Sequence, residues 1–273
     1  MIDPVRTPAQ SDEKEPNTTI GGERLAWPPA GPEWYYVDDD VALAHGDCRN
    51  ILPELGPVDV VVTDPPYGDT SLEWDVPVRD WLGLVDAPQV WCFGSMRFWL
   101  EHGDEFAAWT YGQEIIWEKH NGSGFHADRF RRVHELAVHW YRGEWRSLHH
   151  EPPLIFAAVA TVIKRRKQRP PHMGAIGDKG YESEDGGPKL MRSVQYVRSE
   201  HGHAVHRTQK PLGILRPLIE YSCPTAGLVL DPFAGSGSTL LAARELGRRA
   251  IGIESELAHC EAAVARLSQG VLL

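Results

Sequence analysis

The 273-residue sequence predicts an α/β fold in which buried parallel strands alternate with helices. Two apolar runs support this prediction: residues 58–63 lead into Asp64-Pro65-Pro66-Tyr67, and residues 228–230 lead into Asp231 and a glycine-rich turn. Both runs lack the polar alternation of a half-exposed strand, which indicates burial on both faces. Because open α/β sheets bind ligands at the carboxyl ends of their strands, both loops are candidate site segments.

The first half of the chain predicts five strands and two helices. A strand at 41–45 ends at Gly46-Asp47, and a short helix follows at 49–55. The β-branched run at 59–63 is the second strand, and 89–93 is a third, ended by Gly94-Ser95. A helix is expected at 96–108, and two apolar runs predict further strands at 114–118 and 135–141.

The second half begins irregularly and then becomes periodic. Residues 152–205 are rich in proline, glycine and charge. An amphipathic helix with proline in its first turn is expected at 211–222. The remaining elements are a strand at 228–231, a helix at 237–246, a strand at 250–254 and a helix at 256–267.

Composition narrows the class of protein. Hydrophobic residues make up 42% and charged residues 24% of the chain, as in ordinary globular proteins, and no apolar run approaches the roughly 20 residues of a membrane span. Residues 1–32 are polar and proline-rich, so we expect a loosely ordered tail ahead of one domain at 33–273.

Four scattered cysteines without Cys-x-x-Cys spacing predict no metal site and favour a reducing, cytoplasmic location; they are Cys48, Cys92, Cys223 and Cys260.

Charge is distributed unevenly along the chain. The net charge is −10, yet residues 1–87 hold 5 basic and 18 acidic side chains, whereas residues 125–172 hold 10 basic and 4 acidic ones. A local basic surface can bind phosphates while the rest of the molecule stays acidic. A solvated charged face is the alternative interpretation of the same pattern.

The turn after Asp231 has the layout of a nucleotide-binding loop, in which glycines let the backbone approach a ligand closely. It lacks the Gly-Lys-Ser/Thr of a phosphate loop and the Gly-x-Gly-x-x-Gly dinucleotide pattern. Its Phe-x-Gly-x-Gly form resembles the S-adenosylmethionine loop of methyltransferases. This resemblance implies that five residues bind the cofactor: Asp231, Phe233, Gly235, Gly237 and Ser238.

Two acidic residues at other strand ends are further candidates for this cofactor site. Glu254 lies 19 residues after Gly235 at the end of the next strand, where a carboxylate can bind ribose hydroxyls. A helix-start glutamate is the alternative. Asp47 is expected to meet the adenine amine of the cofactor, with a helix cap as its alternative.

The Asp64-Pro65-Pro66-Tyr67 loop suits methylation of an exocyclic base amine, whose lone pair is delocalised into the ring. The Asp64 carboxylate and the Pro65 carbonyl can accept hydrogen bonds from the amine, and the two prolines make the loop stiff. Tyr67 offers a flat face to a base swung out of a duplex. A proline turn with a packing tyrosine is the alternative.

With these motifs, in this order, the chain resembles the beta-class DNA amino-methyltransferases across about residues 35–268. Further matches are Trp91 to Ser95, Ile116 to Lys119, Phe130 to Glu135 and His206 to Pro211. The resemblance implies a circularly permuted, mixed but mostly parallel seven-stranded Rossmann-like sheet with helices on both faces. It also implies S-adenosylmethionine as cofactor, with Thr208 and Lys210 near its methionine end, and a target-recognition insertion at about 143–206.

An Asp-Pro-Pro-Tyr loop looks like that of N6-adenine enzymes, so site-specific adenine methylation of double-stranded DNA is the expected activity. Within the insertion, a basic run is expected to bind DNA phosphates; its members are Lys164, Arg165, Arg166, Lys167 and Arg169. Cytosine-N4 methylation, methylation of a protein amide and a non-catalytic DNA-binding module remain alternatives. The sequence leaves open whether the chain forms a homodimer, and it predicts no membrane contact.

Overall fold

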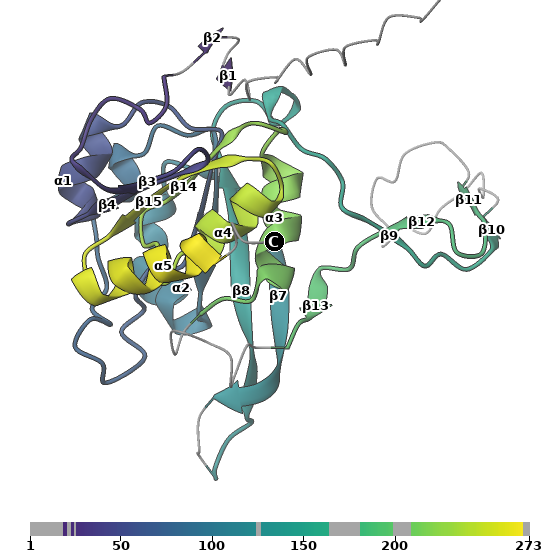
Figure 1. Cartoon of the computed structure of the whole chain (residues 1–273). Coiled ribbons are helices and arrows are strands. Elements are labelled where there is room, and N and C mark those ends of the chain that lie inside the picture. Colours follow the sequence, from purple (N-terminus) through teal and green to yellow (C-terminus); the bar gives the residue numbers. More distant parts are fainter. Residues whose placement is uncertain are drawn as a thin grey trace, which may run out of the picture.

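The computed structural model describes residues 19–20, 23–24, 26–123, 127–163, 181–198 and 209–269. Its main feature is one large sheet (Figure 1). In the described part of the chain this sheet has nine strands, in the order β13 (Val194–Tyr196), β7 (Thr110–Ser123), β8 (Arg132–Tyr141), β6 (Gln89–Gly94), β5 (Val60–Thr63), β14 (Leu228–Asp231), β15 (Arg249–Glu254), β4 (Val41–His45) and β3 (Trp34–Val37).

The centre of the sheet is parallel. Strands β6, β5, β14, β15 and β4 run in one direction, with registers such as Leu230 opposite Val61 and Ile251 opposite Ala42. β8 is antiparallel to both β6 and β7, β13 is parallel to β7, and β3 is antiparallel to β4. All five central strands therefore present their carboxyl ends at the same edge.

Helices cover both faces of the sheet (Figure 1). α3 (Leu212–Ser222), α4 (Ser238–Glu245) and α5 (Leu257–Gln269) lie on one face, and α1 (Cys48–Ile51) and α2 (Met96–His102) lie on the other. Short 3₁₀ turns extend several connections: η1 (Leu52–Glu54), η2 (Leu82–Leu84), η3 (Gly103–Phe106) and η4 (Trp145–Ser147). The result is a three-layer α/β/α arrangement.

The hydrophobic core is divided by the sheet into two clusters. On the face of α3, α4 and α5, Leu215, Leu240 and Cys260 pack against strand residues such as Val62. On the opposite face, Ile51 and Phe98 pack against residues such as Val61. Consecutive residues of β5 thus enter opposite clusters, which is why the run Val60-Val61-Val62 carries no polar side chain.

Two small ribbons lie apart from the main sheet, between β8 and α3 in the chain (Figure 1). β9 (Leu154–Phe156) pairs with β12 (Pro188–Leu190), and β10 (Thr161–Ile163) pairs with β11 (Tyr181–Ser183). Near the amino terminus, β1 (Thr19–Ile20) pairs with β2 (Glu23–Arg24). The region expected to be irregular therefore contains two hairpin-like pairings.

All seven strands predicted from the sequence are present, but the sheet contains two more, so the expected seven-stranded sheet has nine strands in the described residues. β3 and β13 were missed because each is an edge strand with half-exposed residues and pairs with one neighbour only. The end of the predicted tail also contacts the domain. The Trp27 indole N–H donates to the Asp38 carbonyl at 2.7 Å, and the Arg249 guanidinium lies 5.0 Å from the centroid of the Trp27 ring.

Candidate active site at the carboxyl edge of the sheet

A cleft of about 1040 Å³, including its open mouth, lies where β4, β5, β14 and β15 end. The loops after these four strands supply most of its wall, as expected for parallel strands that finish at one edge. Predicted site residues among its lining are Asp47, Asp64, Pro66, Lys210, Asp231, Phe233, Gly235, Ser238 and Glu254.

The glycine-rich turn between β14 and α4 bends sharply around this cleft. Gly235 has φ of +52°, and a Cβ built on it would meet no atom within 4 Å, so its surface faces open space. Gly237 also has positive φ, at +73°, and its Cβ would lie 3.2 Å from that of Ala263 on α5. Glycine is therefore required for backbone conformation at both positions, and for helix packing at the second.

Asp231, the last residue of β14, is buried at the base of the cleft. Its Oδ1 accepts a hydrogen bond from the Thr63 hydroxyl at 2.7 Å and another from the Phe233 N–H at 3.1 Å. Burial raises the pKa of Asp231 to about 6, although these hydrogen bonds oppose the rise. The carboxyl group is thus set to change its charge near neutral pH.

Glu254 connects the end of β15 to the glycine turn. Its Oε2 accepts from the Gly235 N–H at 2.7 Å, and its Oε1 accepts from the Glu256 N–H at 2.8 Å and lies 3.5 Å from His259 Nδ1. The His259 ring in turn meets the edge of Trp74, with centroids 5.8 Å apart. Trp74 and His259 both line the cleft, and together they give it an aromatic wall.

Asp47 lies both at the cleft and at the start of α1. It lines the cleft and it also caps α1, because its Oδ1 accepts from the Arg49 N–H at 2.9 Å. The Arg49 guanidinium pairs with the same carboxylate, at 2.5 Å from Oδ2, and this hydrogen bond lowers the pKa of Asp47. The helix-cap interpretation is realised in the structure, and the carboxylate remains accessible from the cleft.

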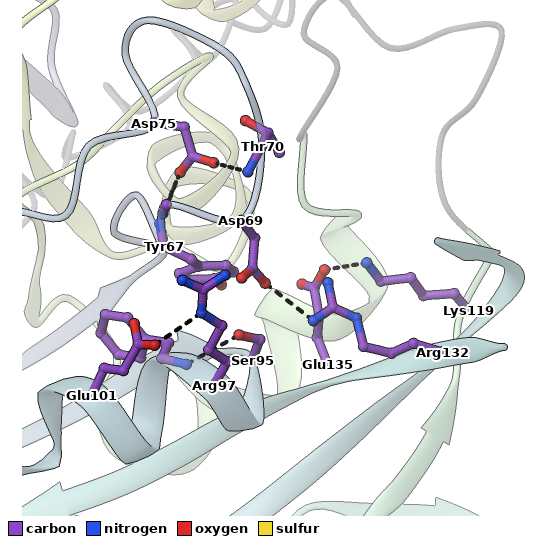
Figure 2. A network of polar contacts seen from close by, with 12 residues as sticks. Tyr67, Asp69, Thr70, Asp75, Ser95, Arg97, Glu101, Lys119, Arg132 and Glu135 are labelled. Atoms are coloured by element: carbon purple, nitrogen blue, oxygen red, sulfur yellow. Dashed lines mark hydrogen bonds and ion pairs between the residues drawn. The ribbon is translucent and has the colours of Figure 1, made fainter. Parts of the chain in front are cut away.

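The loop after β5 is held by an acidic residue that the sequence analysis did not select. Asp75 accepts from the N–H groups of Tyr67, Gly68 and Thr70 at 2.9, 2.9 and 2.7 Å. Figure 2 shows the bonds to Tyr67 and Thr70. Burial opposes ionisation of Asp75, but the hydrogen bonds from Thr70 and the backbone outweigh it and lower the pKa. Figure 2 also shows Arg132 of β8 reaching Asp69 of this loop, at 3.1 Å.

Asp64 lies at the start of this loop with both carboxylate oxygens engaged. The Tyr67 hydroxyl donates to Oδ1, and the Lys210 ammonium donates to Oδ2. The Tyr67 ring packs against Phe98 of α2, with centroids 5.4 Å apart. The first and last residues of the Asp-Pro-Pro-Tyr motif are thus bonded to each other, and a lysine from a distant segment completes the group.

Two comparisons with known proteins bear on family membership. Residues 58–265 match the model of a family described as DNA methylase, which covers more than half of the chain. The chain belongs to this DNA methylase family. Among curated proteins it resembles the putative methylase YubD of Escherichia coli K12, with 57% identity over 53 residues, or 19% of this chain and 23% of the relative.

A second curated relative is the type II methyltransferase M2.LlaDCHI of Lactococcus lactis subsp. cremoris, 44% identical over 73 residues, or 27% of each chain. The matched segments therefore span about a quarter of each relative. Among solved structures, the M1.HpyAVI–SAM complex matches with a TM-score of 0.55 and 24% identity, over 83% of this chain and 99% of that one. The cytosine-N4-specific PvuII DNA methyltransferase matches with a TM-score of 0.59 and 13% identity, over 87% of this chain and 89% of that one. These likenesses establish the shared fold.

The structure brings most of the predicted site residues together. Pro65, Tyr67 and Gly237 do not line the cleft; Tyr67 contacts Asp64, and Gly237 faces α5. Thr208 and the basic run lie outside the described residues, the run being Lys164, Arg165, Arg166, Lys167 and Arg169. Sequence reasoning missed Trp74, Asp75, Lys119, Glu135 and His259. Lys119 and Glu135 lie in two of the segments that resemble the family, Ile116 to Lys119 and Phe130 to Glu135, but neither residue was predicted to belong to the site.

All four cysteines are free and buried, which agrees with packing positions. In the ranges that the structure describes, no group of three or more His, Cys, Asp or Glu side chains could hold a metal ion. Within the same ranges, no helix is long and apolar enough to cross a membrane.

Proposed function

We propose that this chain is an S-adenosylmethionine-dependent DNA methyltransferase that modifies the exocyclic N6 amine of adenine in double-stranded DNA. One observation carries the proposal: Asp64 of the Asp-Pro-Pro-Tyr loop and the glycine turn at Gly235 open on the same cleft. Membership of the DNA methylase family supports it. A methyl donor and an amine acceptor must meet within bonding distance, so their binding groups must share one cavity.

The residues around the glycine turn fit S-adenosylmethionine. Gly235 leaves open space for a ligand, and Asp231 places a buried carboxyl group beside it that can balance positive charge on the methionine part. Glu254, held by two backbone N–H groups, keeps acceptor capacity for ribose hydroxyls. Asp47 and the Trp74–His259 wall are the proposed contacts of the adenine part. The cofactor supplies an electrophilic methyl group.

Asp64 is the proposed acceptor for the substrate amine. A hydrogen bond from the amine to a carboxylate increases electron density on nitrogen and stabilises the positive charge that develops there. In the structure the Tyr67 hydroxyl holds the Oδ1 position, so the amine would take that place when a base enters. The Pro65 carbonyl is the proposed second acceptor. Pro66 stiffens the loop, and the Tyr67 ring is the proposed stacking surface.

Adenine is the proposed target because the loop begins with aspartate, and cytosine N4 is the second candidate. The cytosine-N4-specific PvuII DNA methyltransferase has a higher TM-score than the M1.HpyAVI complex, which supports that second candidate. A non-catalytic DNA-binding module fits less well, since Asp64, Asp231, Gly235 and Glu254 are all intact and converge on one cleft.

The order of the motifs and the long connection between β8 and α3 suggest how DNA is recognised. The catalytic loop precedes the glycine turn, which supports a circularly permuted arrangement. The connection at about 143–206 carries the two small ribbons and the basic run, and we assign it target recognition, with residues 33–273 as the methyltransferase domain.

Transfer of a labelled methyl group from S-adenosylmethionine to duplex DNA tests the proposal. We expect incorporation by the wild-type protein and a loss of roughly 100-fold or more in Asp64→Ala. Cofactor binding measured by calorimetry should change little in that variant, because Asp64 acts on the amine. Near-normal turnover by Asp64→Ala would refute the role of this residue.

A further inference from the structure

Four side chains of alternating charge form a continuous chain behind the catalytic loop; Lys210 and Glu135 are buried, and Asp64 and Lys119 are partly exposed. Lys210 pairs with Asp64 and lies 3.1 Å from Glu135 Oε2, and the other oxygen of Glu135 accepts from Lys119 (Figure 2 shows this last contact). The four residues come from the loop after β5, the segment before α3, β8 and β7. The order of charges is negative, positive, negative and positive, so the group is neutral as a whole.

The Lys210 ammonium is enclosed by aromatic rings as well as by carboxylates. Its Nζ lies 5.6 Å from the Tyr67 centroid, 5.3 Å from that of Phe93 and 5.9 Å from that of Trp117. The side chain is only 8% exposed. An ammonium enclosed in this way has few positions open to it, so it holds the Asp64 oxygen that it contacts in one place.

Burying these charges, wholly or in part, costs solvation, and a neutral core of the same volume would serve folding as well. The cost is explained if the charges act on Asp64. A carboxylate that accepts from a base amine must be ionised and must point one oxygen into the cleft. Lys210 can meet both requirements, because it occupies Oδ2 and leaves Oδ1 facing the Tyr67 hydroxyl.

We propose that Lys210, held in place by Glu135, is a positioning residue that keeps the Asp64 carboxylate ionised and oriented for the substrate amine. This inference rests on the proposed methyl transfer. It also replaces the expectation that Lys210 binds the cofactor: both carboxylates that it contacts lie in the network around the Asp-Pro-Pro-Tyr loop.

The reaction explains why the charge of Asp64 matters. The amine nitrogen forms a bond to the methyl carbon while the carbon–sulfur bond breaks, and the sulfur keeps that electron pair as a neutral thioether. Nitrogen becomes positively charged and then releases one proton, by way of the carboxylate, to water. A protonated Asp64 would neither stabilise this charge nor accept the proton.

The groups that face Asp64 act on it in opposite directions. Burial raises the pKa of Asp64, the Lys210 ammonium lowers it, and the Glu135 carboxylate raises it again. The Tyr67 hydroxyl lowers it by donating a hydrogen bond. The Asp64 carboxylate also raises the pKa values of Cys92 on β6 and Asp231 on β14, because like charges repel. Lys210 and Glu135 thus exert opposing effects on one carboxyl group.

Opposite shifts of the pH–rate profile test the proposal. In Lys210→Met the acid limb of kcat should move to higher pH by about one unit or more, and kcat at pH 7 should fall at least tenfold. In Glu135→Gln the same limb should move to lower pH, because a repelling charge is removed from Asp64. Lys210→Arg should recover most of the activity. The control is Arg216→Met, which removes an exposed cation of α3 that pairs with Glu245 at 2.5 Å, and it should leave the profile unchanged.

Binding measurements separate the two roles of Lys210. Calorimetry with S-adenosylmethionine should give dissociation constants for Lys210→Met and Glu135→Gln within about threefold of wild type. A tenfold weaker constant with an unchanged kcat at saturation would make Lys210 a cofactor ligand and overturn the proposal. Shifts of the acid limb in the same direction for both variants would also overturn it.

A measurement without turnover keeps this test independent of the proposed function. If the wild-type protein transfers no methyl group to DNA, the methyl-transfer proposal fails. The carboxyl ¹³C resonance of Asp64 can still be titrated in labelled wild-type and variant proteins. Positioning by Lys210 predicts a pKa of Asp64 that rises in Lys210→Met and falls in Glu135→Gln, and unchanged values would reject it. Should Lys210→Met not fold, Glu135→Gln alone decides by the sign of its shift.

Discussion

At the scale of single residues, Asp231 should make cofactor affinity depend on pH. Burial raises its pKa to about 6, and a cationic ligand beside it favours the ionised form. The affinity for S-adenosylmethionine should therefore weaken as pH falls below about 6, by up to about tenfold for each pH unit. Calorimetry between pH 5 and 7.5 would measure this dependence.

Asp231→Asn is the control for this residue, because it cannot ionise and keeps a similar shape. It should bind the cofactor more weakly at pH 7 and show little dependence on pH over the same range. If the variant kept the full pH dependence of the wild type, the titrating group would have to be another side chain of the cleft, and the role of Asp231 would be rejected.

The sequence could predict that residues of local motifs lie at one edge of the sheet, but it could not predict contacts between distant segments. Asp64, Asp231 and Glu254 each end an apolar strand, and their positions at one sheet edge follow from parallel pairing alone. Glu135 and Lys119 lie within neighbouring strands and pair with each other, and Lys210 reaches Glu135 from another segment of the chain. No local pattern encodes such a contact.

At the scale of elements, the loop after β5 should depend on Asp75. This carboxylate accepts three backbone hydrogen bonds and thereby fixes the conformation of Tyr67, Gly68 and Thr70. Asp75→Ala should lower the free energy of unfolding by about 1–3 kcal/mol, since it leaves three partly buried backbone donors without this acceptor. It should also reduce kcat more than it weakens cofactor binding.

Urea unfolding and hydrogen exchange of the loop amides would measure the effect of Asp75→Ala. Asp75→Asn, which retains an acceptor oxygen without the charge, is the matched variant and should lose less stability. Equal stability and equal exchange protection in Asp75→Ala and wild type would show that the loop is held by other contacts.

The basic run of the insertion should bind DNA phosphates. Replacing Lys164, Arg165, Arg166, Lys167 and Arg169 by glutamine should weaken DNA binding and flatten its salt dependence, by roughly 0.9 in the logarithmic slope for each phosphate that the variant no longer neutralises. Cofactor affinity should stay unchanged, since the cleft is formed by other loops. If the neutralised protein kept the wild-type DNA affinity and salt slope, the basic run would not be the DNA-binding element, and another part of the insertion would have to bind DNA.

The sequence pattern predicted where two helical segments lie but not where the α-helix within each of them ends. The helix expected at 96–108 is α-helical only to His102 and continues as a 3₁₀ turn at Gly103. The helix expected at 49–55 changes in the same way at Leu52, where Pro53 has no N–H to continue the α-helical pattern. Apolar periodicity detects the buried face of such a segment, and both kinds of helix present a similar face.

At the scale of the whole molecule, buried His139 should make folding sensitive to acid. It is fully buried in β8, stacks on Trp91 at 4.7 Å and contacts Gln89 at 3.1 Å. Burial, with a smaller contribution from His150, lowers its pKa from 6.5 to about 4. Between pH 6.5 and 4, His139 is therefore protonated in the unfolded chain but neutral in the folded protein. The free energy of unfolding falls as the pH drops through this range.

This effect should cost about 2 kcal/mol between pH 7.5 and 5. His139→Gln, which stays neutral, should lose that much less of its stability over the same pH range, although it is less stable at pH 7.5 because it packs less well against Trp91. Urea unfolding at both pH values would compare the two proteins. A stability difference between them that does not change with pH would contradict the role of His139.

The order of the strands in the sheet explains why the site residues meet although they are far apart in the chain. A parallel sheet collects the loops after β4, β5, β14 and β15 into one cleft, and the strands of the β7–β8 hairpin supply the lysine and glutamate that lie behind Asp64. The strand order could not be predicted from the apolar runs alone, because pairing between segments far apart in the chain depends on which faces the helices cover.

The most direct test of the central claim is nucleoside analysis of DNA treated with the protein and isotopically labelled S-adenosylmethionine. After digestion, mass spectrometry should detect labelled N6-methyl-2′-deoxyadenosine with the wild-type protein and at most about one hundredth of that amount with Asp64→Ala. Labelled N4-methyl-2′-deoxycytidine in its place would correct the target base and keep the reaction. The absence of any labelled nucleoside, with the protein folded and the cofactor bound, would contradict the proposal that this chain methylates DNA.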